Sequence, residues 1–160
     1  MKTAILYASK SGATAKCASY LRTQIHGDVE IYDKKDIGKV DFSKFDKIII
    51  GSPVYAGQID KDIKKFCEEN TNLLKDKIVG LFVSSIEMSK KAMEYIEDGF
   101  PKTVYEYSIA QGIFGGELIF SEMGFVARTM MKMMTKSKED IKCIDEERIR
   151  EFAKKINSFK

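Results

Sequence analysis

The stretch Lys2-Thr-Ala-Ile-Leu-Tyr-Ala8, followed directly by Ser9-Lys-Ser-Gly-Ala-Thr14, decides the fold. The first half predicts a short buried strand, because its apolar residues fall on both faces. Apolar residues recur at roughly helical spacing from Ala13 to Ile25, which predicts a helix immediately after the polar turn. A buried strand that leads through such a turn into a helix is typical of an α/β protein with a parallel sheet.

The same alternation continues along the chain. We expect further strands near residues 28–33, 47–51, 78–84 and 108–114, and further helices near residues 60–70, 90–97 and 145–157. Strands of this kind indicate a parallel sheet that helices cover on both faces. We therefore predict an α/β fold of three layers, with a doubly wound five-stranded parallel sheet in the order 2-1-3-4-5. The whole of 1–160 is predicted to form one domain, with a Met-rich helical insert near 118–142.

Composition excludes several classes of function. The cysteines Cys17, Cys67 and Cys143 are scattered, which argues against a disulfide framework and fits a reducing compartment. His26 is the only histidine, so we expect neither a metal site nor a serine–histidine triad. The N-terminal apolar stretch, Ala4 to Ala8, is too short for a signal peptide, so we expect a cytoplasmic protein. The net charge of +3 is small, and we expect no nucleic-acid partner.

The loop after the first strand has the chemistry of a phosphate site. Ser9, Ser11 and Thr14 offer hydroxyl donors, and Gly12 lets the backbone bend closely around a ligand. Successive backbone N–H groups and the positive end of the next helix attract an anion, and Lys10 adds charge at the rim. The alternative is a polar turn with a serine or threonine N-cap, and this loop alone leaves that alternative open.

Other phosphate-binding and phosphoryl-transfer families do not match this loop. The Gly-x-x-x-x-Gly-Lys pattern of a Walker loop and the Gly-x-Gly-x-x-Gly dinucleotide fingerprint are both absent. A cysteine-based phosphatase needs a thiol in the loop, whereas the nearest cysteine, Cys17, falls in the following helix. A receiver domain needs acidic residues where this chain has Ala8-Ser9 and Ser52-Pro53.

With these rivals removed, the chain resembles the flavodoxin superfamily over essentially its whole length. The matching motifs are Ser9-x-Ser11-Gly12-x-Thr14 and Gly51-Ser52-Pro53-Val54-Tyr55-Ala56-Gly57. The resemblance implies noncovalent FMN whose phosphate is held by Ser9, Lys10, Ser11, Gly12, Ala13 and Thr14. It also implies that the isoalloxazine ring lies between two further loops, formed by Pro53, Val54, Tyr55, Ala56 and Gly57 and by Ser84, Ser85, Ile86 and Glu87.

In this interpretation the flavin carries the chemistry, so no catalytic side chain is expected. Tyr55 is the best candidate to stack on the ring, because it offers a broad aromatic face. The loop Ser84–Glu87 contains no aromatic residue, so one face of the ring is expected to be open to a substrate.

A narrower resemblance is to the FMN-dependent, flavodoxin-like protoporphyrinogen oxidase branch. It is based on Lys10, on Tyr55-x-Gly57 and on the Met-rich segment Arg128-Thr-Met-Met-Lys-Met-Met134. This resemblance implies direct oxidation of a substrate with quinone as the acceptor. The broader resemblance implies electron transfer with a redox partner protein, or small-scale flavin reductase chemistry. Both remain open, as does a third use of the fold, a flavin-free interaction module.

The Met-rich segment also allows two interpretations. Methionine fills irregular core gaps well, so a helix here would pack onto the domain through Phe125, Val126, Met130, Met133 and Met134. Alternatively, these residues form an exposed surface for a partner, a quinone or peripheral contact with an anionic membrane, flanked by Arg128, Lys132, Lys136 and Lys138.

Overall fold

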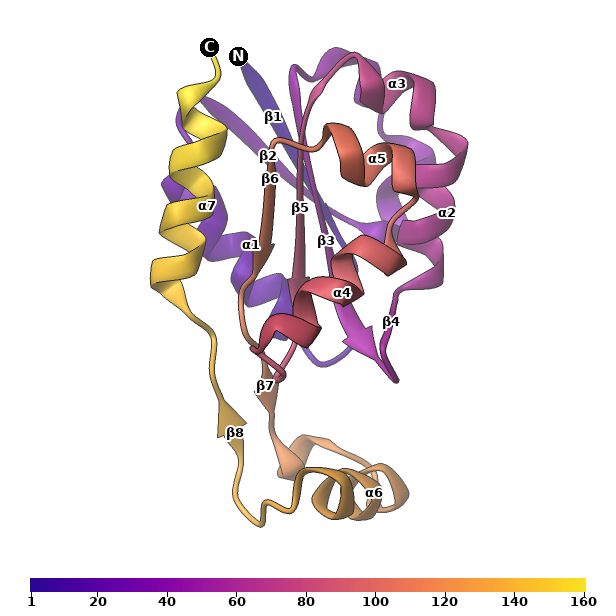
Figure 1. Cartoon of the computed structure of the whole chain (residues 1–160), viewed down its shortest axis with the longest axis vertical. Helices are drawn as coiled ribbons and strands as arrows, with labels where there is room; N and C mark the ends of the chain where they lie inside the picture. Colours follow the sequence, from indigo (N-terminus) through magenta and orange to yellow (C-terminus); the bar gives the residue numbers. More distant parts are fainter.

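A computed structural model describes residues 1–160. Five parallel strands form its central sheet in the order β2-β1-β3-β5-β6, which confirms the predicted fold class and strand order (Figure 1). These strands are β1 (Lys2–Tyr7), β2 (Asp28–Asp33), β3 (Lys47–Tyr55), β5 (Ile78–Ser84) and β6 (Ala110–Ile113). A sixth strand, β4 (Gln58–Ile59), was not predicted and pairs antiparallel with the end of β3.

Helices cover both faces of this sheet. On one face lie α1 (Ala13–Gln24) and α7 (Glu146–Ser158) (Figure 1). On the other face lie α2 (Lys61–Glu69), α3 (Thr71–Lys75), α4 (Lys90–Gly99) and α5 (Lys102–Tyr107). Two short 3₁₀ helices, η1 (Lys34–Lys39) and η2 (Phe42–Lys44), connect β2 to β3. The helices on each face enclose a separate hydrophobic core.

The continuous apolar runs of the strands supply both cores at once. Successive side chains of a strand point to opposite faces, so Ile49 lies in the core beneath α1 and α7, whereas Ile48 and Ile50 lie in the other core. Ile49 pairs in register with Ile5 of the neighbouring strand, whose side chain enters the same core. This two-sided burial is the physical reason that the strands show no polar alternation.

Both ends of α7 are capped by side chains. Asp145, the N-cap, accepts a hydrogen bond from the backbone N–H of Arg148 at 3.1 Å. At the other end, the buried ammonium of Lys47 donates to the carbonyls of Ile156 at 2.8 Å and Phe159 at 2.6 Å. Burial lowers the pKa of Lys47. These bonds attach the C-terminal helix to the first residue of β3.

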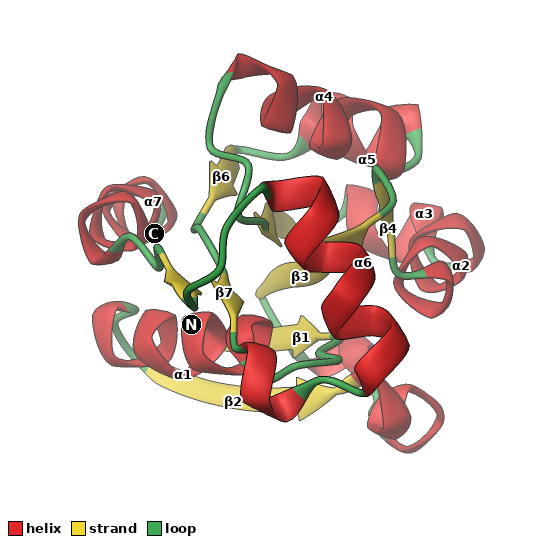
Figure 2. Cartoon of the chain, turned by 90° about the horizontal axis from the view of Figure 1, so that it is seen from below, coloured by secondary structure: helices red, strands yellow, loops and turns green.

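The Met-rich segment is carried on a two-stranded ladder. Strand β7 (Glu117–Leu118) pairs antiparallel with β8 (Ile141–Lys142), and the chain between them forms η3 (Phe120–Glu122) and α6 (Phe125–Thr135). The helix lies beyond the carboxyl ends of the parallel strands, where it crosses in front of the sheet in the view from below (Figure 2).

The interpretation that the Met-rich helix packs its apolar residues onto the domain is wrong. No residue of α6 is buried, and the exposed fraction is 81% for Phe125 and 75% for Met133. The polar contact of α6 is made within the insert by Arg128, whose guanidinium donates to the carbonyl of Met123 at 3.0 Å. No helix of the chain is both long enough and apolar enough to span a bilayer.

Candidate functional site

The loop between β1 and α1 is organised by the side chain of Ser9. Its hydroxyl oxygen accepts hydrogen bonds from the backbone N–H groups of Gly12 at 3.1 Å and Ala15 at 3.4 Å. Gly12 has φ of 94°, a left-handed conformation that favours glycine, and no atom lies within 4 Å of the position of a Cβ there. Ser9 and Gly12 together hold the loop in a tight bend at the start of the helix.

This bend presents a set of unused donors. The backbone N–H groups of Lys10, Ser11, Ala13 and Thr14 donate to no acceptor in the protein, and the Ser11 and Thr14 hydroxyls make no hydrogen bond. The α1 dipole adds positive potential at the same place. A phosphate monoester offers several acceptor oxygens and negative charge, so these donors fit it.

The second predicted loop is largely strand. β3 continues to Tyr55 and returns through β4, with Tyr55 paired to Gln58, so the predicted loop 53–57 is reduced to a two-residue turn. Ala56 and Gly57 form this turn with φ of 47° and 74°, which is typical of a type I′ hairpin. The hairpin holds Tyr55 at the carboxyl end of the sheet with 46% of its surface exposed.

The first two loops meet through a contact between side chains. The Lys10 ammonium lies 4.7 Å from the centroid of the Tyr55 ring, within the range of a cation–π interaction. The cationic rim of the phosphate loop therefore lies against the aromatic face proposed to stack on the flavin. Pro53 and Val54 lie behind Tyr55 as paired residues of β3, and Pro53 is buried.

The third predicted loop is fixed by hydrogen bonds of its own. Ser84 and Ser85 are buried, and the Ser85 hydroxyl accepts from the N–H of Glu87 at 3.1 Å. The Glu87 carboxylate accepts in turn from the N–H of Ser89 at 2.8 Å, and this bond lowers the pKa of Glu87. Glu87 is therefore an exposed anion that orders the entry to α4, and Ile86 is half-buried beside it.

The structure also shows a support for the third loop that motif reasoning missed. The Gly115 carbonyl accepts from the N–H of Ser85 at 3.0 Å, and the Gly116 carbonyl accepts from the N–H of Cys143 at 2.9 Å. A salt bridge of 2.6 Å between Lys16 and Glu117 joins the same region to α1. The adjacent glycines Gly115 and Gly116 are the only signal of this support in the sequence.

The three thiols differ in accessibility. Burial raises the pKa of Cys17 and of Cys67 to about 12, whereas Cys143 is partly exposed. Because the thiolate is the reactive form, an aromatic disulfide reagent at about pH 8 should modify Cys143 rapidly and the other two only after unfolding. Counting released chromophore gives one fast thiol in the native protein and three in guanidinium. A Cys143→Ser variant should have none that react fast; three fast thiols in the native protein would contradict the described burial.

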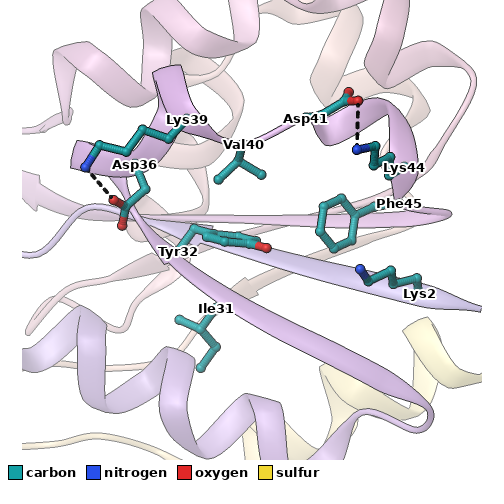
Figure 3. Close-up of a pocket in the computed structure, with 9 residues that line it drawn as sticks. All are labelled: Lys2, Ile31, Tyr32, Asp36, Lys39, Val40, Asp41, Lys44 and Phe45. Carbon is teal, nitrogen blue, oxygen red and sulfur yellow. Dashed lines mark hydrogen bonds and ion pairs between the residues drawn. The ribbon is translucent and has the colours of Figure 1, made fainter.

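A pocket of about 610 Å³ lies elsewhere, beside β2 at the edge of the sheet (Figure 3). Its floor includes Tyr32, and its lysines are already paired with neighbouring carboxylates. Lys39 lies 3.3 Å from Asp36, and Lys44 lies 3.6 Å from Asp41. None of the predicted site residues lines this pocket, and its neutralised charges give it no evident ligand.

Comparisons with known proteins agree with the geometry. A family model described as a flavodoxin domain matches residues 4–144. A flavodoxin from Streptococcus pneumoniae TIGR4 superposes with a TM-score of 0.60 at 16% identity, covering 99% of this chain and 99% of that chain. A short-chain flavodoxin associated with a non-canonical PDU bacterial microcompartment gives a TM-score of 0.61 at 16% identity, covering 100% and 99% of the two chains. No curated protein sequence matches significantly.

A larger protein also contains this fold. Rubredoxin:oxygen oxidoreductase from Desulfovibrio gigas matches with a TM-score of 0.57 and 17% identity over 98% of this chain. The chain spans only 35% of that enzyme's length. At these identities the similarities show the fold alone.

Proposed function

The chain belongs to the flavodoxin domain family, whose cofactor is FMN, and we propose that it uses this flavin for electron transfer or small-scale flavin reductase chemistry. Its partners would be a redox protein or a small molecule that exchanges electrons with the flavin. When bound, FMN supplies the redox chemistry, and the protein positions it and tunes its potential.

The observation that carries this proposal is the group of free donors at the start of α1. Four backbone N–H groups and the hydroxyls of Ser11 and Thr14 have no partner within the protein, although Thr14 itself is buried. A ligand with several acceptor oxygens and negative charge can accept from all of these donors at once, so it is stabilised at this position. Lys10 adds a cation at the rim, and Tyr55 offers an aromatic face next to it.

A second candidate function is direct oxidation of a substrate, as in the protoporphyrinogen oxidase branch, with quinone as acceptor. Two observations favour it. The loop Ser84–Glu87 places no aromatic side chain at the site, which leaves room for a substrate. The insert that carries α6 lies beyond the same carboxyl ends of the strands as the three loops (Figure 2).

The experiment that tests both candidates is stepwise anaerobic reduction of the purified protein, followed by absorption spectroscopy. We expect a yellow protein with one FMN per chain. Uptake of electrons in two separate one-electron steps supports the electron carrier. Bleaching by a porphyrinogen, with recovery of colour on addition of a quinone, supports the oxidase. Colourless protein that takes up no FMN when offered it contradicts both functions.

A further inference from the structure

Helix α6 has an apolar face that nothing in the chain covers. We define the α6 apolar face as Phe125, Val126, Met130, Met133 and Met134. Their exposed fractions run from 55% for Met130 to 81% for Phe125. Exposed apolar clusters of this kind are typical of interaction sites.

The orientation of this helix is the reverse of an ordinary surface helix. Val126, Met130, Met133 and Met134 follow the spacing i, i+4, i+7 and i+8, so they project from one side. The half-buried polar residues Arg128, Lys132 and Thr135 lie on the opposite side of the helix. The Lys132 ammonium there lies 5.1 Å from the Phe120 ring centroid. The polar side therefore contacts the rest of the insert, whereas the apolar side is left exposed.

The charge around the α6 apolar face selects the kind of partner. Four basic residues lie in 123–138, and the acidic residues Glu122, Glu139 and Asp140 border this range. Arg128 and Lys132 lie on the polar side of α6, which leaves Lys136 and Lys138 as the cations that flank the α6 apolar face. Lys136 and Lys138 are exposed immediately after the helix ends. An anionic lipid surface satisfies both the apolar side chains and the lysines.

We propose that the α6 apolar face and its flanking lysines dock onto an anionic lipid bilayer. At 11 residues the helix is too short to span the membrane, so it would lie in the interfacial plane. Because α6 lies beyond the carboxyl ends of the parallel strands, docking turns that end of the sheet toward the lipid (Figure 1). This orientation rests on the proposed flavin function and would suit an apolar electron acceptor dissolved in the bilayer.

Flotation of the FMN-loaded chain with liposomes tests the docking. We expect the protein to float with phosphatidylcholine vesicles that contain phosphatidylglycerol, less so as salt is raised, and not with phosphatidylcholine alone. Met133→Glu with Met134→Glu should abolish flotation. Lys136→Gln with Lys138→Gln should weaken binding about 25-fold, at about fivefold for each charge. Met93→Glu, at another exposed methionine on α4, serves as the matched control and should float like the unmodified protein.

Three outcomes would overturn the proposal. These are no flotation on anionic vesicles at low salt, full flotation of the Met133 and Met134 variant, and equal binding to neutral vesicles. A lipid-free dimer that dissociates in this variant, measured by sedimentation, would assign the α6 apolar face to a second copy instead. FMN content is read from the visible spectrum of the same samples. Flotation of protein that binds no FMN would therefore refute the flavin function and leave the docking intact.

Discussion

Replacing Ser11 by alanine and Thr14 by valine together is expected to weaken FMN binding by about two to four orders of magnitude. Each hydroxyl would donate to a charged phosphate, and such a bond contributes about 1.5–3 kcal/mol. Neither hydroxyl has a hydrogen bond within the protein, so its removal leaves no protein acceptor without a donor. The loss should therefore appear in ligand affinity rather than in stability. Quenching of FMN fluorescence during titration of the apoprotein measures the dissociation constant.

Two controls separate the loss of phosphate contacts from a general disturbance of the loop. Riboflavin lacks the phosphate, so its affinity should not change in the double variant. Thr23→Val removes a hydroxyl near the far end of α1, where it donates to the carbonyl of Tyr20 at 2.7 Å, and should leave FMN affinity unchanged. If riboflavin and FMN affinities fell equally, the assignment of these hydroxyls to the phosphate would be wrong.

The second large effect is expected at Gly115. Alanine there should lower the free energy of unfolding by about 3 kcal/mol or more, because two separate penalties combine. The residue has φ of +77°, and an added Cβ would lie 1.8 Å from the carbonyl oxygen of Cys143. The backbone must shift to relieve this contact. Since the Gly115 carbonyl also accepts from Ser85, the shift should weaken FMN binding as well.

Urea denaturation followed by circular dichroism measures the loss of stability. Gly38→Ala is the matched control, because nothing lies within 4 Å of its Cβ position and its φ is not in the left-handed region. That variant should stay within about 0.5 kcal/mol of the unmodified protein. A Gly115→Ala protein as stable as the control would show that the chain does not approach Cys143 as closely as described.

The fold was predictable because its strands are strongly apolar and are well separated along the sequence. The bounds predicted for β2 and β5 agree with the structure, and the helix from Ala13 was expected within one residue of its end. The short helices α3 and α5 were missed, since five or six residues carry too little periodicity. The extension of β3 to Tyr55 was also missed, because it depends on pairing with β4.

The sequence predicted which three loops form the site. It did not predict the contacts that hold these loops in place. The order of strands brings the loops after β1, β3 and β5 to one edge, as the topology predicts. The contact of Lys10 with Tyr55 and the backing of Ser85 by Gly115 depend on the tertiary path of the chain. The outward orientation of the α6 apolar face was equally beyond a periodicity argument. Periodicity finds an apolar side but does not say what covers it.

The pairing of β7 with β8 means that residues 119–140 could be replaced by another segment. Leu118 pairs with Ile141, and the N–H of Asp145 bonds to the carbonyl of Phe114 at 2.8 Å, so the two ends of the segment are already adjacent at its base. Changing the length of residues 119–140 then costs little entropy of loop closure. Residues 119–140 could therefore be replaced by a different segment while the rest of the chain keeps its fold. Joining Leu118 to Ile141 by a tight turn would yield a minimal version of the protein.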